Sequence, residues 1–285
     1  MTTHGRAAML QAGAAIALWG MLAWLGLRLK HVPPFLLVGC ALLIGSLCGV
    51  HRLPEWRVRP AVLLLGVYGL FGFHFFLFVA LRMAPPLEAN LVNYLWPLLI
   101  VLLAPLVDSQ QRLGARHVIA ALSGFAGTVL LLGGAAGWQP ATLSATAWIG
   151  YACAFVSALI WSTYSLLTRR AGNFSSAAVG LFCLVSGLAA LACHALLEPA
   201  YVLVSGDWPY LLLLGIGPMG LAFFLWDGAL KRGDPRGLGA LSYLTPLIST
   251  GVLAAAGEGR LSVSVVAAVA LIVFGAIAGN LAGRG

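Results

Sequence analysis

The sequence predicts an all-α polytopic membrane protein, in which ten transmembrane helices form two inverted five-helix repeats around a central cavity. Three observations lead to this fold class: the composition, a series of ten apolar runs, and an internal repeat. The 285 residues are 61% hydrophobic and 8% charged, and the mean hydropathy is +0.98. Because a soluble domain carries about 25% charged residues, this composition indicates a chain that lies mostly within a bilayer.

Each apolar run is about 20 residues long, which is the length that a helix needs to cross the hydrocarbon core of a bilayer. Similar runs recur to the end of the sequence, so we expect the first one not to be a cleaved signal peptide. Proline or glycine marks most of the joints, as expected where helices end, and we expect no separate soluble domain. The predicted spans cover residues 9–27, 33–50, 60–81, 86–106, 116–134, 146–168, 175–196, 208–230, 235–256 and 262–282.

The distribution of Lys and Arg predicts how the chain lies in the membrane. With the N-terminus in the cytoplasm, the outer loops hold only four of the 16 Lys and Arg residues, which are Arg28, Lys30, Arg82 and Arg260. Positive charge favours the cytoplasmic side of a membrane. We therefore expect a multi-pass protein of the cytoplasmic (inner) membrane with both termini in the cytoplasm.

An internal repeat relates the two halves of the chain. A shift of 149 residues places residues 94–98 (Tyr-Leu-Trp-Pro-Leu) on residues 243–247 (Tyr-Leu-Thr-Pro-Leu) without a gap. A shift of 142 places residues 17–19 on residues 159–161, and both triplets end in Trp. Five spans is an odd number, so the second half must thread the membrane in the opposite direction, as in many secondary transporters. The predicted repeats are residues 1–140 and 141–285.

The fourth span begins with a polar and aromatic stripe, which consists of Asn90, Asn93, Tyr94 and Pro97. Helical spacing puts these residues on one face. Such a face should turn toward other helices or a water-filled cavity rather than toward lipid. A single Asn can be no more than a hydrogen bond between helices. Two amides, a Tyr and a Pro together favour the wall of a transport cavity.

Two other spans offer side chains for the same cavity. His74 lies well inside the third span and could receive a substrate carboxylate or carry a proton, or it could be a neutral imidazole bonded between helices. In the sixth span, Trp161 and Tyr164 could clamp a flat ring or a cationic amine, or they could belong to an interfacial aromatic belt. Trp19 holds the place of Trp161 in the first span and is a weaker candidate, whereas Trp24 fits a belt.

The predicted substrate-binding residues are therefore His74, Asn90, Asn93, Tyr94, Pro97, Trp161, Tyr164, Ser242 and Tyr243. Pro97 and Pro246 lie near the middle of their spans, where each proline removes a backbone hydrogen bond and favours a bend. We expect these two prolines to act as paired gates of an alternating-access cycle.

Three further features are better explained by structure than by chemistry. Asp227 lies one turn from Lys231, a spacing that an interfacial ion pair explains better than a proton site. Glu88 could complement a helix N-terminus or stand at the outer mouth of the cavity. Small residues at Gly275, Gly279 and Gly283 fit close helix packing, either within the chain or against another copy.

The sequence also excludes several classes of function. An intramembrane aspartyl protease needs two Asp residues within spans, and Asp227 alone is available; Gly-x-Ser-x-Gly, His-Glu-x-x-His and Walker motifs are absent. We expect no enzyme, no catalytic residues, no cofactor, no metal site and no nucleic-acid partner, and a chain that acts as a monomer. The net charge of +8 reflects loop charges. The odd set of cysteines inside apolar runs favours free thiols, at Cys40, Cys48, Cys153, Cys183 and Cys193.

Residues 80–97, read together with the duplicated ten-span layout, resemble the EamA-type drug/metabolite transporter superfamily. More narrowly, Glu-Ala-Asn at 88–90 followed by Asn-Tyr-Leu-Trp-Pro at 93–97 resembles its aromatic amino acid exporters. The resemblance implies ten helices in two inverted halves around a central cavity, and export of small metabolites from the cytoplasm. The second repeat departs from this string, with Ser242 where the first has Asn, so the cavity cannot be symmetric.

The predicted function is a secondary transporter that exports small amphiphilic metabolites by alternating access, with aromatic amino acids as the first candidate. A site of rings and amides without a deep fixed charge suits a zwitterion with an aromatic side chain, and suits a nucleotide sugar poorly. A broad exporter of amino acids or cationic aromatic drugs is the alternative, and a receptor or scaffold without transport is another. Proton coupling and facilitated diffusion both remain open.

Overall fold

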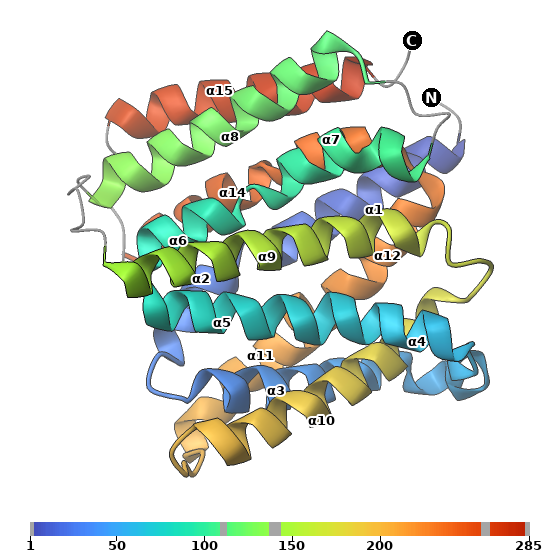
Figure 1. The fold of residues 1–285 in the computed structure, drawn as a ribbon, viewed down its shortest axis with the longest axis vertical. Helices are drawn as coiled ribbons and strands as arrows, with labels where there is room; N and C mark the ends of the chain where they lie inside the picture. Colours follow the sequence, from blue (N-terminus) through green and yellow to red (C-terminus); the bar gives the residue numbers. More distant parts are fainter. Residues whose placement is uncertain (1–2, 109–112, 137–143, 258–262, 283–285) are drawn as a thin grey trace.

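The computed structural model describes residues 3–108, 113–136, 144–257 and 263–282, and it is helical throughout its regular structure. The helices lie side by side in one bundle (Figure 1). Within the described residues, nine helical stretches are long and apolar enough to cross a membrane, and a tenth apolar stretch, Val266–Ala278, is shorter. The prediction of an all-α membrane protein is confirmed. Arg260 and Gly283, which the sequence analysis names, lie outside the described residues.

The first half contains α1 (Thr3–Trp19), α2 (Leu22–Arg28), α3 (Pro34–Ser46), η1 (Leu47–Trp56), α4 (Pro60–Val67), η2 (Tyr68–Gly72), α5 (Phe73–Met83), α6 (Pro86–Asn93), α7 (Trp96–Val107) and α8 (Ala115–Ala136). The second half contains α9 (Ala145–Thr168), η3 (Ser176–Ala178), α10 (Val179–Leu197), η4 (Ser205–Asp207), α11 (Trp208–Ile216), η5 (Gly217–Leu221), α12 (Ala222–Arg232), α13 (Pro235–Ser242), α14 (Leu244–Ala255) and α15 (Val263–Ala282).

The element boundaries repeat with the offset that the sequence predicts. The π-helical turns η2 and η5 begin at Tyr68 and Gly217, which are 149 residues apart. Helices α6 and α13 begin at Pro86 and Pro235, with the same offset. In Figure 1, α1 and α9 run across the bundle in opposite directions. The two halves are therefore inverted copies of one five-helix unit.

Span 4 is not one continuous helix. Helix α6 ends at Asn93 and α7 begins at Trp96, so Tyr94 and Leu95 interrupt the span. Pro97 has no N–H to donate to the carbonyl of Asn93, and its ring crowds that turn. Span 9 breaks likewise, because Pro246 follows a junction between α13 and α14 at Tyr243. The predicted stripe from Asn90 to Pro97 is therefore divided between two helices, which corrects the assumption of a single continuous face.

The second span also differs from the prediction of residues 33–50. Its α-helix ends at Ser46, and the chain continues to Trp56 as a 3₁₀-helix, η1, with a kink at Arg52 (φ −127°, ψ 40°). Pro54 lies inside η1 and cannot donate a backbone hydrogen bond. The first span is divided as well, because α1 ends at Trp19 and α2 begins at Leu22.

Small residues allow the last helices of the two halves to pack closely. A Cβ atom added to Gly275 on α15 would lie 2.6 Å from the carbonyl oxygen of Ala120 on α8, which is too close for any other residue. The α8–α15 pair lies at one edge of the bundle in Figure 1. The interpretation of Gly275 as a packing residue is confirmed, and its partner belongs to the same chain.

Glu198 joins three helices at the end of the bundle opposite the termini. Its fully buried carboxylate accepts hydrogen bonds from the backbone N–H groups of Phe35 (3.0 Å) and Leu36 (3.2 Å) at the start of α3. Arg82 of α5 donates to the same carboxylate at 2.6 Å, and His194 Nδ1 lies 2.9 Å from it. Since these oxygens are fully paired, Glu198 stabilises the bundle.

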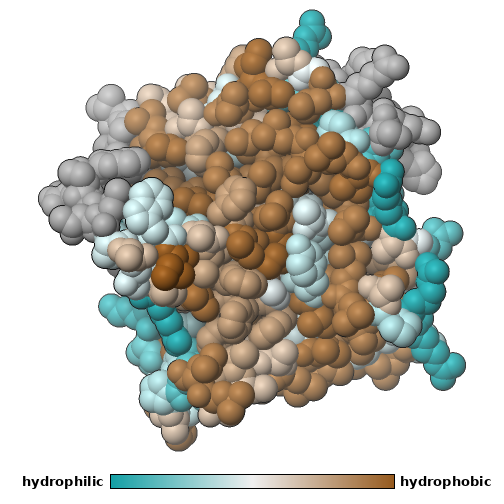
Figure 2. Space-filling model, viewed as in Figure 1, coloured by the Kyte–Doolittle hydropathy of each residue, from teal (hydrophilic) through white to brown (hydrophobic). Residues whose placement is uncertain are grey.

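The surface of the bundle matches a bilayer. Figure 2 shows a broad hydrophobic band across the helices, with hydrophilic residues gathered at the two edges where the helices end. Large apolar side chains lie exposed on the surface of the bundle, such as Leu64, Leu106 and Ile277. Apolar groups on the outside of a bundle are stable when they face hydrocarbon rather than water.

A candidate substrate site of converging aromatic rings

The centre of the bundle is occupied by aromatic side chains around Trp19. The Trp19 ring centroid lies 5.4 Å from that of Trp226, 5.7 Å from Trp161, 6.1 Å from Phe223 and 6.3 Å from Trp96. These five residues come from α1, α7, α9 and α12, so both halves contribute. With their neighbours they form what we call the aromatic cluster: Trp19, Phe73, His74, Trp96, Trp161, Tyr164, Phe223 and Trp226.

Hydrogen bonds hold the indole rings in place. Trp19 donates from Nε1 to the carbonyl of Pro218 (3.1 Å), and Trp226 donates from Nε1 to Ser165 Oγ (3.2 Å). Pro218 lies in the π-helical turn η5, which is irregular backbone at the heart of the bundle. A buried indole N–H needs such a partner. The rings are therefore oriented by the protein.

Two pairs of repeat-equivalent residues meet inside the cluster. Trp19 and Trp161 correspond by the shift of 142, and their rings contact each other. His74 and Phe223 correspond by the shift of 149, and their ring centroids lie 6.4 Å apart. Equivalent residues of two inverted halves can touch only close to the axis that relates the halves. The aromatic cluster therefore lies on that axis, where transporters of this architecture bind their substrates.

His74 connects the cluster to the π-helical turn of the first half. Its Nδ1–H donates to the carbonyl of Leu70 at 2.6 Å, and its ring contacts Phe73 and Phe78. This bond assigns the proton of the neutral imidazole to Nδ1 and leaves Nε2 as an acceptor. His74 is therefore a buried polar residue at the border of the cluster.

The structure brings together three of the predicted site residues, His74, Trp161 and Tyr164. Tyr243 lies elsewhere, fully buried in a second apolar cluster with residues of α7, α8 and α15, and its ring packs against Gly124. Ser242 donates to the carbonyl of Leu238 at 2.9 Å within its own helix.

The remaining predicted residues lie in span 4. Asn93 is buried, and its Oδ1 has no hydrogen-bond partner among the described residues. Asn90 and Tyr94 are partly exposed. Pro97 is buried, and its carbonyl lies close to Gly239 of α13. Their part in substrate binding stays a prediction.

Sequence reasoning missed four members of the cluster: Phe73, Trp96, Phe223 and Trp226. The repeat offset contained a signal for one of them, because Phe223 is the equivalent of His74. Trp19, the weaker candidate, contacts four other rings. A single helix gives no sign that Trp96 and Trp226 meet.

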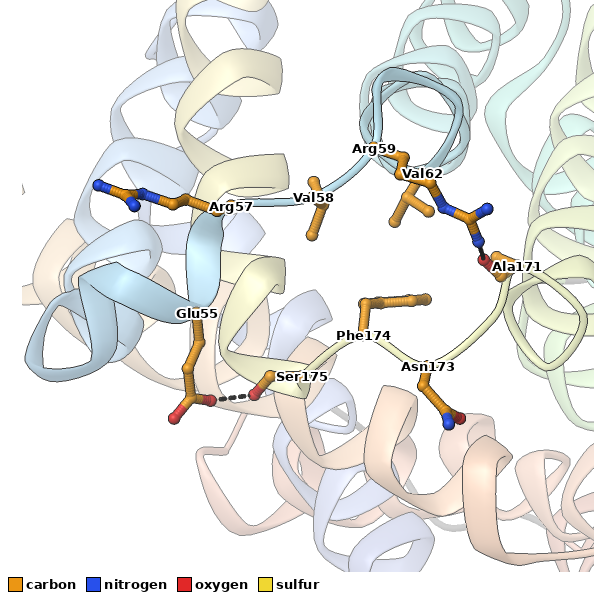
Figure 3. Close-up of a pocket in the computed structure, with 9 residues that line it drawn as sticks. All are labelled: Glu55, Arg57, Val58, Arg59, Val62, Ala171, Asn173, Phe174 and Ser175. Carbon is orange, nitrogen blue, oxygen red and sulfur yellow. Dashed lines mark hydrogen bonds between the residues drawn. The ribbon is translucent and has the colours of Figure 1, made fainter.

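A cavity of about 330 Å³ lies between the start of α4 and the loop that follows α9. This end of the bundle carries Arg57, Arg59, Arg169 and Arg170, and we call it the Arg-rich end. Figure 3 shows Arg59 reaching across the cavity to the carbonyl of Ala171 (3.2 Å), and Glu55 bonded to Ser175. Phe174 also lines the cavity. A smaller cavity of about 140 Å³ at the same end is lined by residues that include Arg169 and Arg170.

The predicted pair of Asp227 and Lys231 forms, with Lys231 Nζ 2.6 Å from Asp227 Oδ2. The Asp227 side chain is 0% exposed and that of Lys231 22%, so the pair is packed within the bundle. Its place at the membrane interface stays a prediction. Both side chains project from α12 toward the loop that follows α9, where Lys231 donates to the carbonyl of Phe174.

Comparison with known proteins agrees with this architecture. The family model described as the EamA-like transporter family matches twice, over residues 6–133 and 148–280. An aromatic amino acid exporter YddG from Ancylobacter novellus is 43% identical over 280 residues, covering 95% of this chain and 96% of that protein. One of the same name from Salmonella typhimurium is 30% identical, covering 76% and 78%.

A solved crystal structure of a protein 42% identical to this chain superposes with a TM-score of 0.93 and covers 98% of both chains. The duplicated helical architecture is thus shared over almost the whole length. The two matches of the family model coincide with the two inverted halves that the helix boundaries define. The chain therefore belongs to the EamA-like transporter family.

Proposed function

We propose that this protein exports aromatic amino acids across the cytoplasmic membrane by alternating access, and that the aromatic cluster is its substrate site. The observation that carries the proposal is the meeting of Trp19 and Trp161, equivalent residues of the two halves, in a group of rings on the axis that relates the halves. The named exporters that are similar over most of this chain support the substrate class.

The chemistry of the cluster suits an aromatic side chain. Indole and phenyl rings bind another ring by offset or edge-to-face contacts, each worth about 0.5–1.5 kcal/mol beyond the burial of area. The ring contacts of Trp19 with Trp96 and Trp161 are already edge-to-face. A substrate ring would take the place of one of these protein–protein contacts. Asn93, with its unpaired buried oxygen, is available to a substrate N–H group.

The helix interruptions supply the movement that alternating access needs. Spans 3 and 8 each contain a π-helical turn, and spans 4 and 9 each break near a proline. Such irregular segments bend more easily than continuous α-helix. Because the cluster rings are packed together, a substrate can enter only when the two halves separate at one end. We propose that spans 4 and 9 bend at Pro97 and Pro246 to allow this separation.

The proposed orientation places both termini in the cytoplasm. The cavities at the Arg-rich end, lined in part by Arg57, Arg59, Arg169 and Arg170, would then face the cytoplasm, from which an exporter takes its substrate. Both halves of the site lie within one chain, so a monomer would suffice. The division between residues 1–140 and 141–285 also falls between the two family matches.

Purified protein in proteoliposomes would test the proposal. We expect efflux of tryptophan and phenylalanine well above that of alanine, and none in empty liposomes. A flux that depends on an imposed pH gradient would assign proton coupling, and one that does not would assign facilitated diffusion. Equal flux of all three amino acids, or of a cationic aromatic dye, would favour the broad exporter. A complete lack of flux would contradict the proposal.

A further inference from the structure

Asp227 has a carboxylate oxygen that the fold leaves without a partner. The side chain is 0% exposed, and Oδ2 binds Lys231 Nζ at 2.6 Å. Its other oxygen, Oδ1, is buried and has no hydrogen-bond partner among the described residues. The Ser176 side chain also interacts with this carboxylate as a hydrogen-bond donor. Oδ1 itself nevertheless has no partner within hydrogen-bond geometry among the described residues. An unpaired buried carboxylate oxygen is costly, so a fold rarely keeps one without a use.

Another buried carboxylate in the described part of the chain looks different. Glu198 is also fully buried, yet both of its oxygens accept hydrogen bonds, from Arg82, from His194 and from two backbone N–H groups. That arrangement is what a purely structural acid requires. Asp227 has one strong partner and one free oxygen, which is the arrangement of a group that binds something further.

The position of Asp227 places it next to the aromatic cluster. On helix α12 it follows Trp226 directly and lies one turn after Phe223, and both of these residues are cluster members. Residues four apart on a helix share a face. The carboxylate therefore stands at the edge of the rings, on the side of the Arg-rich end.

Lys231 links this edge to the larger cavity. Its Nζ donates to the carbonyl of Phe174 at 3.0 Å and lies 3.6 Å from the centroid of the Phe174 ring. Phe174 and the adjacent Ser175 line the cavity of about 330 Å³. Gly172, two residues earlier, has a φ of 92°, which makes a tight turn in this loop. The ion pair thus stands between the cavity and the cluster.

We propose that Asp227 and Lys231 recognise the charged head group of an amino acid zwitterion whose ring enters the aromatic cluster. The α-ammonium group donates to Oδ1 of Asp227, and the α-carboxylate accepts from Lys231. The exchange leaves no net charge buried, because a pair of opposite charges binds a pair of opposite charges. This inference rests on the proposed function and adds the residues that select zwitterions over other indole compounds.

The test is competition against radiolabelled tryptophan bound to the purified full-length protein, so that binding is measured apart from transport. The competitors are tryptamine, which lacks the carboxylate, and indole-3-propionate, which lacks the ammonium group. We expect the wild-type protein to prefer tryptophan over both by about ten- to hundredfold, because a hydrogen bond to a charged group contributes roughly that much.

The two single variants should shift this preference in opposite directions. Asp227→Asn should improve the binding of indole-3-propionate relative to tryptophan, because Lys231 is then free for a carboxylate. Lys231→Met should improve the relative binding of tryptamine. A residue that only stabilises the fold would weaken all three ligands alike. Since a single variant leaves one charge unpaired, the double variant Asp227→Asn/Lys231→Met removes both charges together, and it should lose both preferences.

Asp234→Asn is the matched control, because Asp234 pairs with Arg236 near the same end of the bundle but is partly exposed. This variant should keep both preferences. If the wild-type protein binds tryptophan and the Asp227 and Lys231 variants keep wild-type selectivity, this inference is wrong and the proposed function stands. If the wild-type protein binds no aromatic amino acid, the proposed function fails and the inference falls with it.

Discussion

The residues in and around the aromatic cluster divide into those whose rings contact many other rings and those that orient the rings. Trp161 belongs to the first group, since its ring contacts Trp19, Trp96, Tyr164 and Phe223. Ser165 belongs to the second, because it accepts a hydrogen bond from an indole. A substitution in the first group should therefore change the choice of substrate, whereas one in the second should loosen the site.

Trp161→Leu should lower the apparent affinity for tryptophan by about tenfold or more while affecting alanine little, because the variant keeps apolar volume and loses ring contacts of about 0.5–1.5 kcal/mol each. The measurement is the concentration dependence of efflux from proteoliposomes for both amino acids. Trp148→Leu on the same helix is the control, since Trp148 is 59% exposed. Equal losses for tryptophan and alanine would show that the Trp161 indole is only structural.

Asn93→Ala should reduce export without reducing the amount of folded protein. Its buried Oδ1 has no partner among the described residues, so the fold loses no hydrogen bond at that atom, whereas a substrate would lose an acceptor. The comparison is efflux rate against membrane abundance and thermal stability of the purified variant. Normal export at equal abundance would remove Asn93 from the site.

At the scale of single elements, close helix packing depends on where a glycine meets a neighbouring helix. Gly275→Ala should destabilise the protein by about 1–3 kcal/mol, because the new methyl group would overlap backbone atoms of α8 that cannot move aside. Gly13→Ala on α1 is the control, since nothing lies within 4 Å of its added Cβ. There the helix should gain up to about 1 kcal/mol. Thermal unfolding in detergent distinguishes the two, and an undisturbed Gly275→Ala variant would contradict the packing.

The breaks in spans 4 and 9 form the paired elements of the transport cycle. Pro97→Ala and Pro246→Ala should keep substrate affinity but slow turnover, because each restores a backbone hydrogen bond and straightens its span. Since the two spans enter the membrane from opposite sides, the variants should shift the accessibility of single cysteines in opposite directions. Labelling from each face measures this shift. Movement in the same direction, or none, would mean that these prolines are not paired hinges.

For the whole molecule, the orientation can be measured directly. The native cysteines are first replaced by serine, and a single cysteine is then introduced in place of Arg57. This cysteine should react with a membrane-impermeant reagent only after the cells are opened. A cysteine at Lys30 should react in intact cells. Both positions are exposed, and Lys30 follows α2 whereas Arg57 precedes α4. Figure 1 shows α2 and α4 at opposite ends of the bundle. The reverse pattern would place the termini outside and would make the Arg-rich cavities face away from the cytoplasm.

The amino-acid sequence alone determined the spans and their repetition. Apolar runs report how long each helix is, and the equivalence of residues 94–98 and 243–247 predicted the offset that the π-helical turns and α6 and α13 then showed. These properties are local, because they depend on neighbours within one helix or on comparison of two segments. For the same reason the sequence identified Trp161 and Tyr164 as one helical face.

Only the tertiary structure decided which faces meet. Trp96 and Trp226 lie 130 residues apart, and nothing in either helix indicates that their rings come within 5.9 Å of each other. Tyr243 has the right position in the repeat, yet α13 turns it toward α8 and α15. The burial of Asp227 likewise depends on the loop after α9. Such contacts follow from how helices rotate and cross when they pack, which is a property of all of them together.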